Sequence, residues 1–137
     1  MILTLKQIAQ WTGGIVAPEH ENVEIEGFCA DSRIVKPGQL FVCLIGDHFD
    51  GHDFLGQVSG ICSAALVSRP CSGSLPTVLV KDTTKAYGDI ARAYRRRLDI
   101  NVVGITGSVG KTSTKEMIAA VLNQHYPTLK TEANYNN

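Results

Sequence analysis

The sequence predicts an α/β protein: a small N-terminal α/β domain, followed by the first strand, glycine loop and helix of a second, truncated parallel-sheet domain. Short apolar runs at residues 40–45, 64–67 and 77–80 are separated by helical patterns or loops, which favours a parallel sheet with helical crossovers. A glycine-rich stretch lies between a β-branched run and a helical segment. An amphipathic segment joins the two parts, so we place the boundary at residue 98.

The first predicted elements have clear local signals. Residues 5–12 form a helical pattern in which Thr4 and Gln7 have capping-box spacing, and two glycines follow it. Residues 23–27 alternate apolar and acidic side chains, as a half-buried strand does. A Pro-Gly pair within residues 36–39 predicts a turn.

The next elements predict the parallel sheet itself. Residues 40–45 do not alternate, which indicates a strand buried on both faces. A helix over residues 54–59 and a strand over 64–67 follow, and this order predicts a right-handed parallel crossover. Another strand covers residues 77–80, and a capped helix runs over residues 82–98.

The helix over residues 82–98 has an apolar face and a basic face. The apolar face carries Ala86, Ile90, Ala93, Tyr94 and Leu98, and the basic face carries Arg92, Arg95, Arg96 and Arg97. The basic face is compatible with a phosphate or nucleic-acid patch. We favour a solvated face whose cations lie near the negative end of the helix dipole.

Size and composition limit the possible classes of protein. A chain of 137 residues has room for one domain, or for a small domain and part of another. Hydrophobic residues make up 44% and charged residues 19%, which excludes a wholly disordered chain. Thirteen basic and thirteen acidic residues balance, which argues against nucleic acid or an anionic membrane as the main partner.

Sequence features also bear on the compartment. Residues 1–7 lack the basic start, the apolar stretch and the cleavage site of a signal peptide, and no run of about 18 apolar residues occurs. The four cysteines fit no C-x-x-C pattern; they are Cys29, Cys43, Cys62 and Cys71. We therefore expect a soluble cytoplasmic protein with reduced thiols.

The segment around residue 107 carries the strongest chemical signal. Residues 102–106 are a β-branched run typical of a buried strand. Residues 114–124 have a helical pattern, with core spacing at Met117, Ile118, Val121 and Leu122. Between them stands Gly107-Ser108-Val109-Gly110-Lys111-Thr112-Ser113. A strand, a glycine loop, a Lys-Thr pair and a helix form the architecture of a phosphate-binding loop.

This residue pattern suits a nucleoside triphosphate. Several backbone N–H groups must converge on the phosphate oxygens, and Gly107 and Gly110 allow the tight turns that this needs. Lys111 can reach the β- and γ-phosphates, and the Thr112 hydroxyl can bind Mg²⁺. The strict motif has glycine where this chain has Ile105. The remaining spacing still favours a mononucleotide site over a turn in which lysine and threonine occur by chance.

Two motifs resemble those of one enzyme family, the Mur ligases. Residues 104–117, G-I-T-G-S-V-G-K-T-S-T-K-E-M, resemble the family's ATP loop. Residues 130–137 resemble its G-N-x-N-N segment, with Ala133 in place of glycine. Upstream, D-S-R at residues 31–33, P-G-Q-L-F-V-C-L-I-G and D-G-H-D-F are similar to a signature of the family's N-terminal domain. The resemblance covers nearly the whole chain.

The resemblance implies an ATP-dependent amide ligase of peptidoglycan precursor synthesis, which joins D-alanyl-D-alanine to UDP-N-acetylmuramoyl-tripeptide through an acyl phosphate. Residues 1–98 would form the domain that holds the UDP end of the substrate, and residues 99–137 would begin the domain that binds Mg-ATP. We also expect a monomer without nucleic-acid partner or membrane insertion. Two alternatives stay open: the neighbouring ligase that adds the third amino acid, and a non-catalytic ATP-binding module.

The resemblance also assigns individual residues. ATP would be bound by Gly107, Ser108, Val109, Gly110, Lys111, Thr112 and Ser113, of which Lys111 and Thr112 would be catalytic, with Thr112 meeting the Mg²⁺ of the nucleotide. The UDP end would meet Ser32, Asp47, His48 and Phe49. The active-site cleft would be lined by Asn134, Asn136 and Asn137.

Other clusters have simpler explanations. Metal-ligand residue types gather at Asp47, His48, Asp50, His52 and Asp53. This cluster contains a predicted turn and fits the family signature without a metal, so we expect no metal site. The pair Asp31 and Arg33 is either functional or an exposed structural ion pair. Because residues 99–137 hold too few elements for a closed core, we expect the chain to be the front of a longer enzyme, inactive as a ligase by itself.

Overall fold

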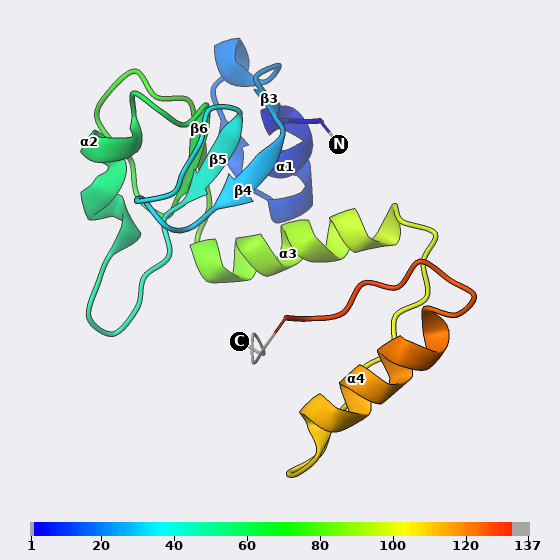
Figure 1. Cartoon of the computed structure of the whole chain (residues 1–137). Helices are drawn as coiled ribbons and strands as arrows, with labels where there is room; N and C mark the ends of the chain where they lie inside the picture. Colours follow the sequence, from blue (N-terminus) through cyan, green and yellow to red (C-terminus); the bar gives the residue numbers. More distant parts are fainter. Residues whose placement is uncertain (1, 133–137) are drawn as a thin grey trace. The chain divides into compact units, whose positions relative to one another are not determined.

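A computed structural model describes residues 2–132 of the chain. The chain divides into two compact units, Met1–Leu98 and Asp99–Asn137 (Figure 1). The first unit is an α/β structure with a largely parallel sheet, which confirms the predicted fold class. Within residues 2–132, no helix combines the length and the apolar character that crossing a membrane requires.

The first unit is built on a five-stranded sheet with the order β2-β7-β6-β5-β4. Four strands are parallel neighbours: β4 (Gly27–Cys29), β5 (Gln39–Val42), β6 (Ala64–Val67) and β7 (Thr77–Leu79). The edge strand β2 (Ile15–Val16) pairs antiparallel with β7. A separate antiparallel pair joins β1 (Leu3–Thr4) and β3 (Glu24–Ile25). The carboxyl ends of β4 to β7 therefore share one edge of the sheet.

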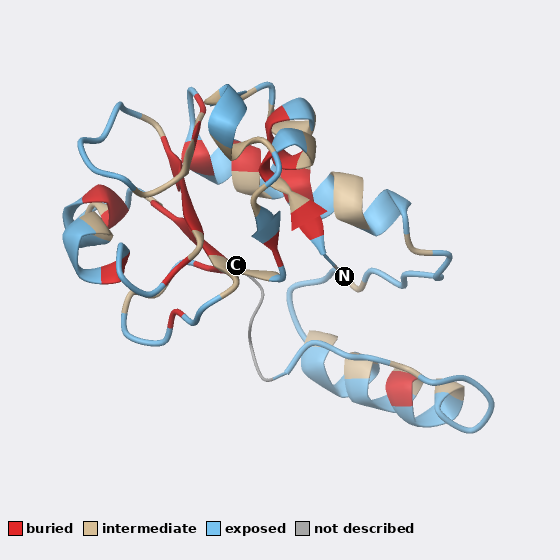
Figure 2. Ribbon diagram, turned by 90° about the horizontal axis from the view of Figure 1, so that it is seen from above, coloured by how far each residue is buried: buried red, intermediate tan, exposed pale blue. Residues whose placement is uncertain are grey.

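Helices cover both faces of this sheet (Figure 1). One face carries α1 (Leu5–Thr12) and α3 (Thr83–Arg96), and the other carries α2 (Leu55–Val58), which continues a 3₁₀ turn at Gly51–Phe54. A further 3₁₀ turn lies at Pro18–His20. Figure 2 shows that buried residues concentrate in the strands and on the helix faces turned toward them.

The central strands are buried on both faces, and this explains their unbroken apolar sequence. In β5, Leu40 and Val42 join the core formed with α1 and α3, whereas Phe41 joins the core formed with α2. Successive side chains of a strand point to opposite faces, so a strand covered on both sides needs apolar residues at every position. The predicted burial on both faces is therefore confirmed for residues 40–43 of the run at residues 40–45.

Helix α1 has the predicted bounds and the predicted caps. The Thr4 hydroxyl accepts a hydrogen bond from the Gln7 amide at 3.3 Å, and the Gln7 side chain accepts one from the Thr4 amide at 3.1 Å. Gly13 ends the helix with φ of 64°, a left-handed conformation that favours glycine.

Two predicted strands of the first unit differ from the structure by more than one residue. Residues 23–27 do not form one strand, because the Glu26 amide donates to the Gly38 carbonyl and the chain passes from β3 in one sheet to β4 in the other. The strand predicted to reach residue 45 ends at Val42, since the chain turns there and leaves Ile45 54% exposed.

The second unit contains one regular element among its described residues, the helix α4 (Lys111–Leu122). The strand predicted at residues 102–106 is wrong: this segment has no ladder partner, and Val102 and Val103 are 65% and 59% exposed. Two of the predicted core positions are also wrong, because Met117 and Val121 are 71% and 69% exposed. A strand and an amphipathic helix both need a second layer, which residues 99–132 do not supply.

Candidate functional site

The glycine loop of residues 107–113 is the first candidate site. Gly107 and Gly110 have φ of 149° and 82°, which side chains rarely allow. Helix α4 begins directly after Gly110, three residues earlier than the sequence predicted, and the Thr114 amide makes its first hydrogen bond to the Gly110 carbonyl at 2.9 Å. The preceding amides of the first turn have no partner within the helix. Their N–H groups and the helix dipole favour an anion at this position.

Lys111 lies over the loop that precedes it. Its Nζ donates to the carbonyl oxygen of Gly107 at 2.6 Å. The ammonium group is therefore held beside the loop amides, where it can exchange a carbonyl partner for a phosphate oxygen. Thr112 and Ser113 are exposed, with their hydroxyls at the start of the helix. Val109 is 91% exposed, which leaves its backbone as the part able to bind a ligand.

The segment after α4 is held along the helix by charged side chains. Lys115 Nζ donates to the carbonyl of Thr131 at 2.7 Å, and Lys130 pairs with Glu116. The hydrogen bond from Lys130 lowers the pKa of Glu116. These contacts bring the end of the described chain back to the helix that carries the loop. The predicted cleft residues Asn134, Asn136 and Asn137 lie outside the described residues.

The second candidate site lies in the first unit, where the chain leaves β5. The Gly46 amide donates to the Phe49 carbonyl at 2.9 Å, and Ile45 forms an isolated antiparallel bridge with Asp50. We call residues 45–50 the β5 turn. Its tip consists of the predicted ligand residues Asp47, His48 and Phe49, all exposed.

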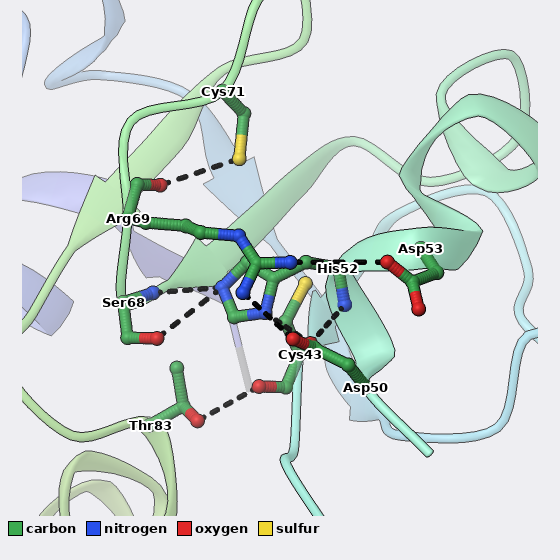
Figure 3. Close-up of polar contacts among 8 residues, drawn as sticks. All are labelled: Cys43, Asp50, His52, Asp53, Ser68, Arg69, Cys71 and Thr83. Carbon is green, nitrogen blue, oxygen red and sulfur yellow. Dashed lines mark hydrogen bonds and ion pairs between the residues drawn. The ribbon is translucent and has the colours of Figure 1, made fainter.

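A polar network fixes the base of the β5 turn (Figure 3). Oδ1 of Asp50 accepts from the amide of His52 at 2.9 Å and lies 2.6 Å from its Nδ1, while Oδ2 accepts from Arg69 at 2.7 Å. On the other side of the ring, the amide of Ser68 donates to Nε2 of His52 at 3.0 Å. Donation from the His52 amide, with further hydrogen bonds from the side chains of His52 and Arg69, lowers the pKa of Asp50 to about 2.

A hollow of about 300 Å³ opens at the same edge of the sheet. Its lining includes Ile45 of the turn, Ser68 after β6 and the first residues of α3. The buried Thr83 hydroxyl ties α3 to this edge by donating to the Cys43 carbonyl at 2.7 Å. Ligands of open α/β sheets bind outside the carboxyl ends of the strands, so the hollow and the turn occupy a favourable place.

A second hollow, of about 340 Å³, lies between α1 and β2. Its charged lining residues are Lys6 and Glu21, which pair with each other at 2.7 Å. Their mutual pairing leaves this hollow without a charged group aimed at a ligand, so the hollow at the carboxyl edge is the stronger candidate.

Ser32 follows β4 at the same sheet edge as the β5 turn. It is half-buried between the partners of an ion pair, in which Arg33 Nε and Nη2 donate to the two carboxylate oxygens of Asp31 at 2.8 and 2.6 Å. The side-chain hydrogen bond from Arg33 lowers the pKa of Asp31 to about 2. Because the Arg33 side chain is 82% exposed, the pair resembles an ordinary surface ion pair. The structure thus brings all four predicted UDP-site residues to one edge.

The structure also bears on two other clusters noted in the sequence. For the residues of metal-ligand type, no group of three or more such side chains gathers anywhere in residues 2–132.

The basic face of α3 has partners within the first unit. Arg92 pairs with Asp89 at 3.1 Å, and the guanidinium of Arg97 lies 4.6 Å from the ring centre of Trp11. These contacts suit a solvated helix face better than a phosphate patch.

Sequence reasoning did not find Ser68, Arg69 and Thr83 as parts of the sheet edge. Ser68 lies 16 residues from its partner His52, and Thr83 lies 40 residues from Cys43. The available signal was topological: residues that follow adjacent parallel strands meet at one edge. Applied to the ends of residues 40–45 and 64–67, this rule would have paired the β5 turn with Ser68.

The chain is similar to known proteins along nearly its whole length. The sequence profile of the Mur ligase middle domain matches residues 105–137, which include the glycine loop. The UDP-N-acetylmuramoyl-tripeptide–D-alanyl-D-alanine ligase of Synechocystis is 48% identical over 121 residues, which is 85% of this chain and 27% of that protein. The chain belongs to the Mur ligase family.

Solved structures extend this Mur ligase match over both units. A crystal structure of MurF from Acinetobacter baumannii superposes with a TM-score of 0.90 at 35% identity, covering 98% of this chain and 30% of that one. The MurF ligase of Thermotoga maritima in complex with ADP gives a TM-score of 0.74 at 34% identity, covering 80% and 26%. This Mur ligase chain therefore spans less than a third of the length of these relatives.

Proposed function

We propose that this chain carries the nucleotide loop and the UDP-substrate end of an ATP-dependent ligase. The enzyme joins D-alanyl-D-alanine to UDP-N-acetylmuramoyl-tripeptide in peptidoglycan precursor synthesis. The observation that carries the proposal is the loop of residues 107–113, with Lys111 held over it at the start of α4. The names of the relatives support the choice of substrates. The proposed reaction takes place in the cytoplasm, because it consumes ATP. The proposed enzyme is a monomer, since each of the two sites is built from residues of one chain.

The residues of the loop suit phosphoryl transfer to a carboxylate. Bound Mg-ATP would supply the γ-phosphoryl group that turns the tripeptide carboxylate into an acyl phosphate, which the amine of D-alanyl-D-alanine then attacks. A carboxylate is a poor acyl donor because its oxide leaves badly, whereas phosphate leaves readily. Lys111 would offset charge on the β- and γ-phosphates, and the Thr112 hydroxyl would bind Mg²⁺. The amides of residues 107–113 would hold the phosphate oxygens.

Each unit has its own part in this proposal. Residues 1–98 would act as the UDP-substrate domain, with Ser32, Asp47, His48 and Phe49 meeting the ligand at the carboxyl edge of the sheet. Residues 99–137 would begin the ATP-binding domain. The support for the first part is that all four residues follow β4 or β5 at one edge, beside the hollow lined by Ser68 and α3.

The variant Lys111→Ala tests the nucleotide half of the proposal. We expect phosphate release by the intact protein to fall about 10²- to 10³-fold, as when one charge-stabilising donor is removed. Binding of UDP-N-acetylmuramoyl-tripeptide, measured by calorimetry, should stay unchanged because that ligand belongs to the other unit. Lys36→Ala is the matched control, since Lys36 is exposed in the turn at the amino end of β5. Equal loss of both properties in Lys111→Ala would refute separate sites.

The same assay separates the rival functions. Phosphate release that requires the UDP-tripeptide and rises with D-alanyl-D-alanine supports the proposal. Stimulation by diaminopimelate or lysine, with the UDP-dipeptide as acyl substrate, would assign the protein to the neighbouring ligase. Nucleotide binding without any phosphate release would leave a non-catalytic module.

A further inference from the structure

A buried histidine, His52, follows the β5 turn, whose tip is proposed to bind UDP. The hydrogen bonds of its side chain go to Asp50 and Ser68 and not to the proposed ligand residues. His52 and Thr83 are the two buried polar side chains in the described part of the chain, and the His52 side chain is 2% exposed. Burying an imidazole costs free energy unless its nitrogens are paired. Both nitrogens are paired here, one with Asp50 and the other with Ser68.

The hydrogen-bond partners of His52 determine which ring nitrogen carries the proton. The Ser68 amide can only donate, so Nε2 of His52 must accept, and the ring proton of the neutral imidazole is on Nδ1. Nδ1 then donates to Oδ1 of Asp50 over 2.6 Å. The ring therefore links a carboxylate on one side to a backbone amide on the other.

Asp50, His52 and Ser68 stand in the order of a catalytic triad, but they cannot act as one. The Ser68 hydroxyl is 3.4 Å from Nε2, while the amide of the same residue donates to that nitrogen at 3.0 Å. The lone pair that a general base would need is already engaged, and the ring is closed off from solvent. His52 is thus suited to holding structure and not to transferring a proton.

The segments that His52 joins are the β5 turn and the end of β6. Asp50 closes the turn through its bridge with Ile45, and Ser68 directly follows β6. Gly51 packs closely against the end of β5. Its amide donates to the Leu44 carbonyl at 2.8 Å, and a side chain does not fit here because a Cβ would lie 2.7 Å from Cys43 Cα. The base of the turn is therefore fixed to two strands, while its tip is exposed.

We propose that His52 is a positioning residue for the UDP end of the substrate. Its two ring nitrogens fix the base of the β5 turn to β6, and thereby set the direction in which Asp47, His48 and Phe49 meet the ligand. A preorganised turn binds without the entropy cost of ordering it first. This inference rests on the proposed function, which assigns those three residues to the UDP end.

The variant His52→Asn tests the positioning role. An asparagine amide keeps a donor near Asp50 but is too short to accept from the Ser68 amide. We expect the KM for UDP-N-acetylmuramoyl-tripeptide to rise about tenfold or more, as small misplacements of binding groups do. The KM for ATP and the kcat at saturating substrate should change less than about twofold. The variant weakens binding of the UDP end equally in the ground state and in the transition state, and such a loss raises KM without lowering kcat.

Two further variants separate positioning from general destabilisation. Ile8→Ala opens a cavity in the core on the opposite face of the sheet; it should lower the melting temperature and leave both KM values unchanged. Arg69→Met removes the outer partner of Asp50 at a half-exposed site; it should fold normally and raise the KM for the UDP-tripeptide by a smaller factor. Should His52→Asn fail to fold, Arg69→Met decides the question.

The outcomes distinguish this inference from the function beneath it. An unchanged KM for the UDP-tripeptide in folded His52→Asn, or in Arg69→Met when His52→Asn does not fold, overturns the positioning role alone. Parallel increases in both KM values, matched by Ile8→Ala, overturn it as well, because they indicate a structural role. If the wild-type protein does not bind the UDP-tripeptide, the proposed function fails and the inference fails with it.

Discussion

At the scale of single residues, Asp50 shows how a charge is used in the β5 turn. It accepts from the His52 amide, the His52 ring and Arg69, and these donors favour the ionised carboxylate. The pKa of Asp50 is lowered from 3.8 to about 2 in the folded state. The unfolded chain therefore takes up the proton first as the pH falls. The stabilisation is fully present above the unfolded pKa and is lost as the pH drops toward 2.

This argument predicts a smaller acid dependence for Asp50→Asn. The variant keeps an oxygen acceptor but has no charge to lose, so its urea midpoint should fall less than that of the wild type between about pH 4 and pH 2. Asp53→Asn is the control, because the Asp53 side chain is 72% exposed and its distance to Arg69 is 3.8 Å, longer than the 2.7 Å between Arg69 and Asp50. The other exposed pairs should titrate equally in all three proteins. Parallel midpoint curves for wild type and Asp50→Asn would contradict the assignment.

The same residues show what sequence alone can and cannot establish about a site. The glycine loop is local: seven consecutive residues supply the glycines, the lysine and the threonine, so the sequence was enough to propose it. The role of His52 is not local, since its second partner lies after another strand. In the sequence, His52 was one member of a cluster of metal-ligand types, and only the pairing of β5 with β6 shows what it contacts.

At the scale of elements, helix α1 depends on its capping box. Thr4 and Gln7 satisfy each other's amides at the start of the helix. We expect Thr4→Ala to lower the free energy of unfolding by about 0.5–2 kcal/mol, measured by chemical denaturation. Thr4→Ser keeps the capping oxygen and should lose much less. If the two variants lose the same stability, the methyl group of Thr4 and not its hydroxyl is what matters.

Elements with local signals were predictable, and elements that need a partner were not. The bounds of α1 follow from its caps, and β6 at Ala64–Val67 follows from a continuous apolar run. The β-branched run at residues 102–106 has the same kind of composition, but a strand forms only when another strand supplies the opposite hydrogen bonds. Likewise, Met117 and Val121 have core spacing on α4 without a layer against which to be buried.

At the scale of the whole molecule, the first unit holds two cores, one on each face of the sheet. Three of its four cysteines lie in one of these cores. Cys29, Cys43 and Cys62 are buried in the core beside α2, whereas Cys71 is exposed. Burial raises the pKa of Cys43 to about 12 and also raises the pKa of Cys62. Because the thiolate is the reactive form, these two groups are protected both by their inaccessibility and by their protonation.

The cysteines therefore allow a test of whether this core opens as one unit. Under native conditions iodoacetamide should modify Cys71 at once and leave Cys43 and Cys62 unlabelled, as followed by mass spectrometry of peptides. With rising urea, labelling of Cys43 and Cys62 should follow a single curve that coincides with the loss of circular dichroism, because both side chains pack in one cluster. Cys71→Ser serves as the control that removes the fast reaction. Labelling of Cys62 before Cys43 would mean that α2 and its flanking loop separate from the sheet while β5 and β6 stay paired, so the two faces would not unfold together.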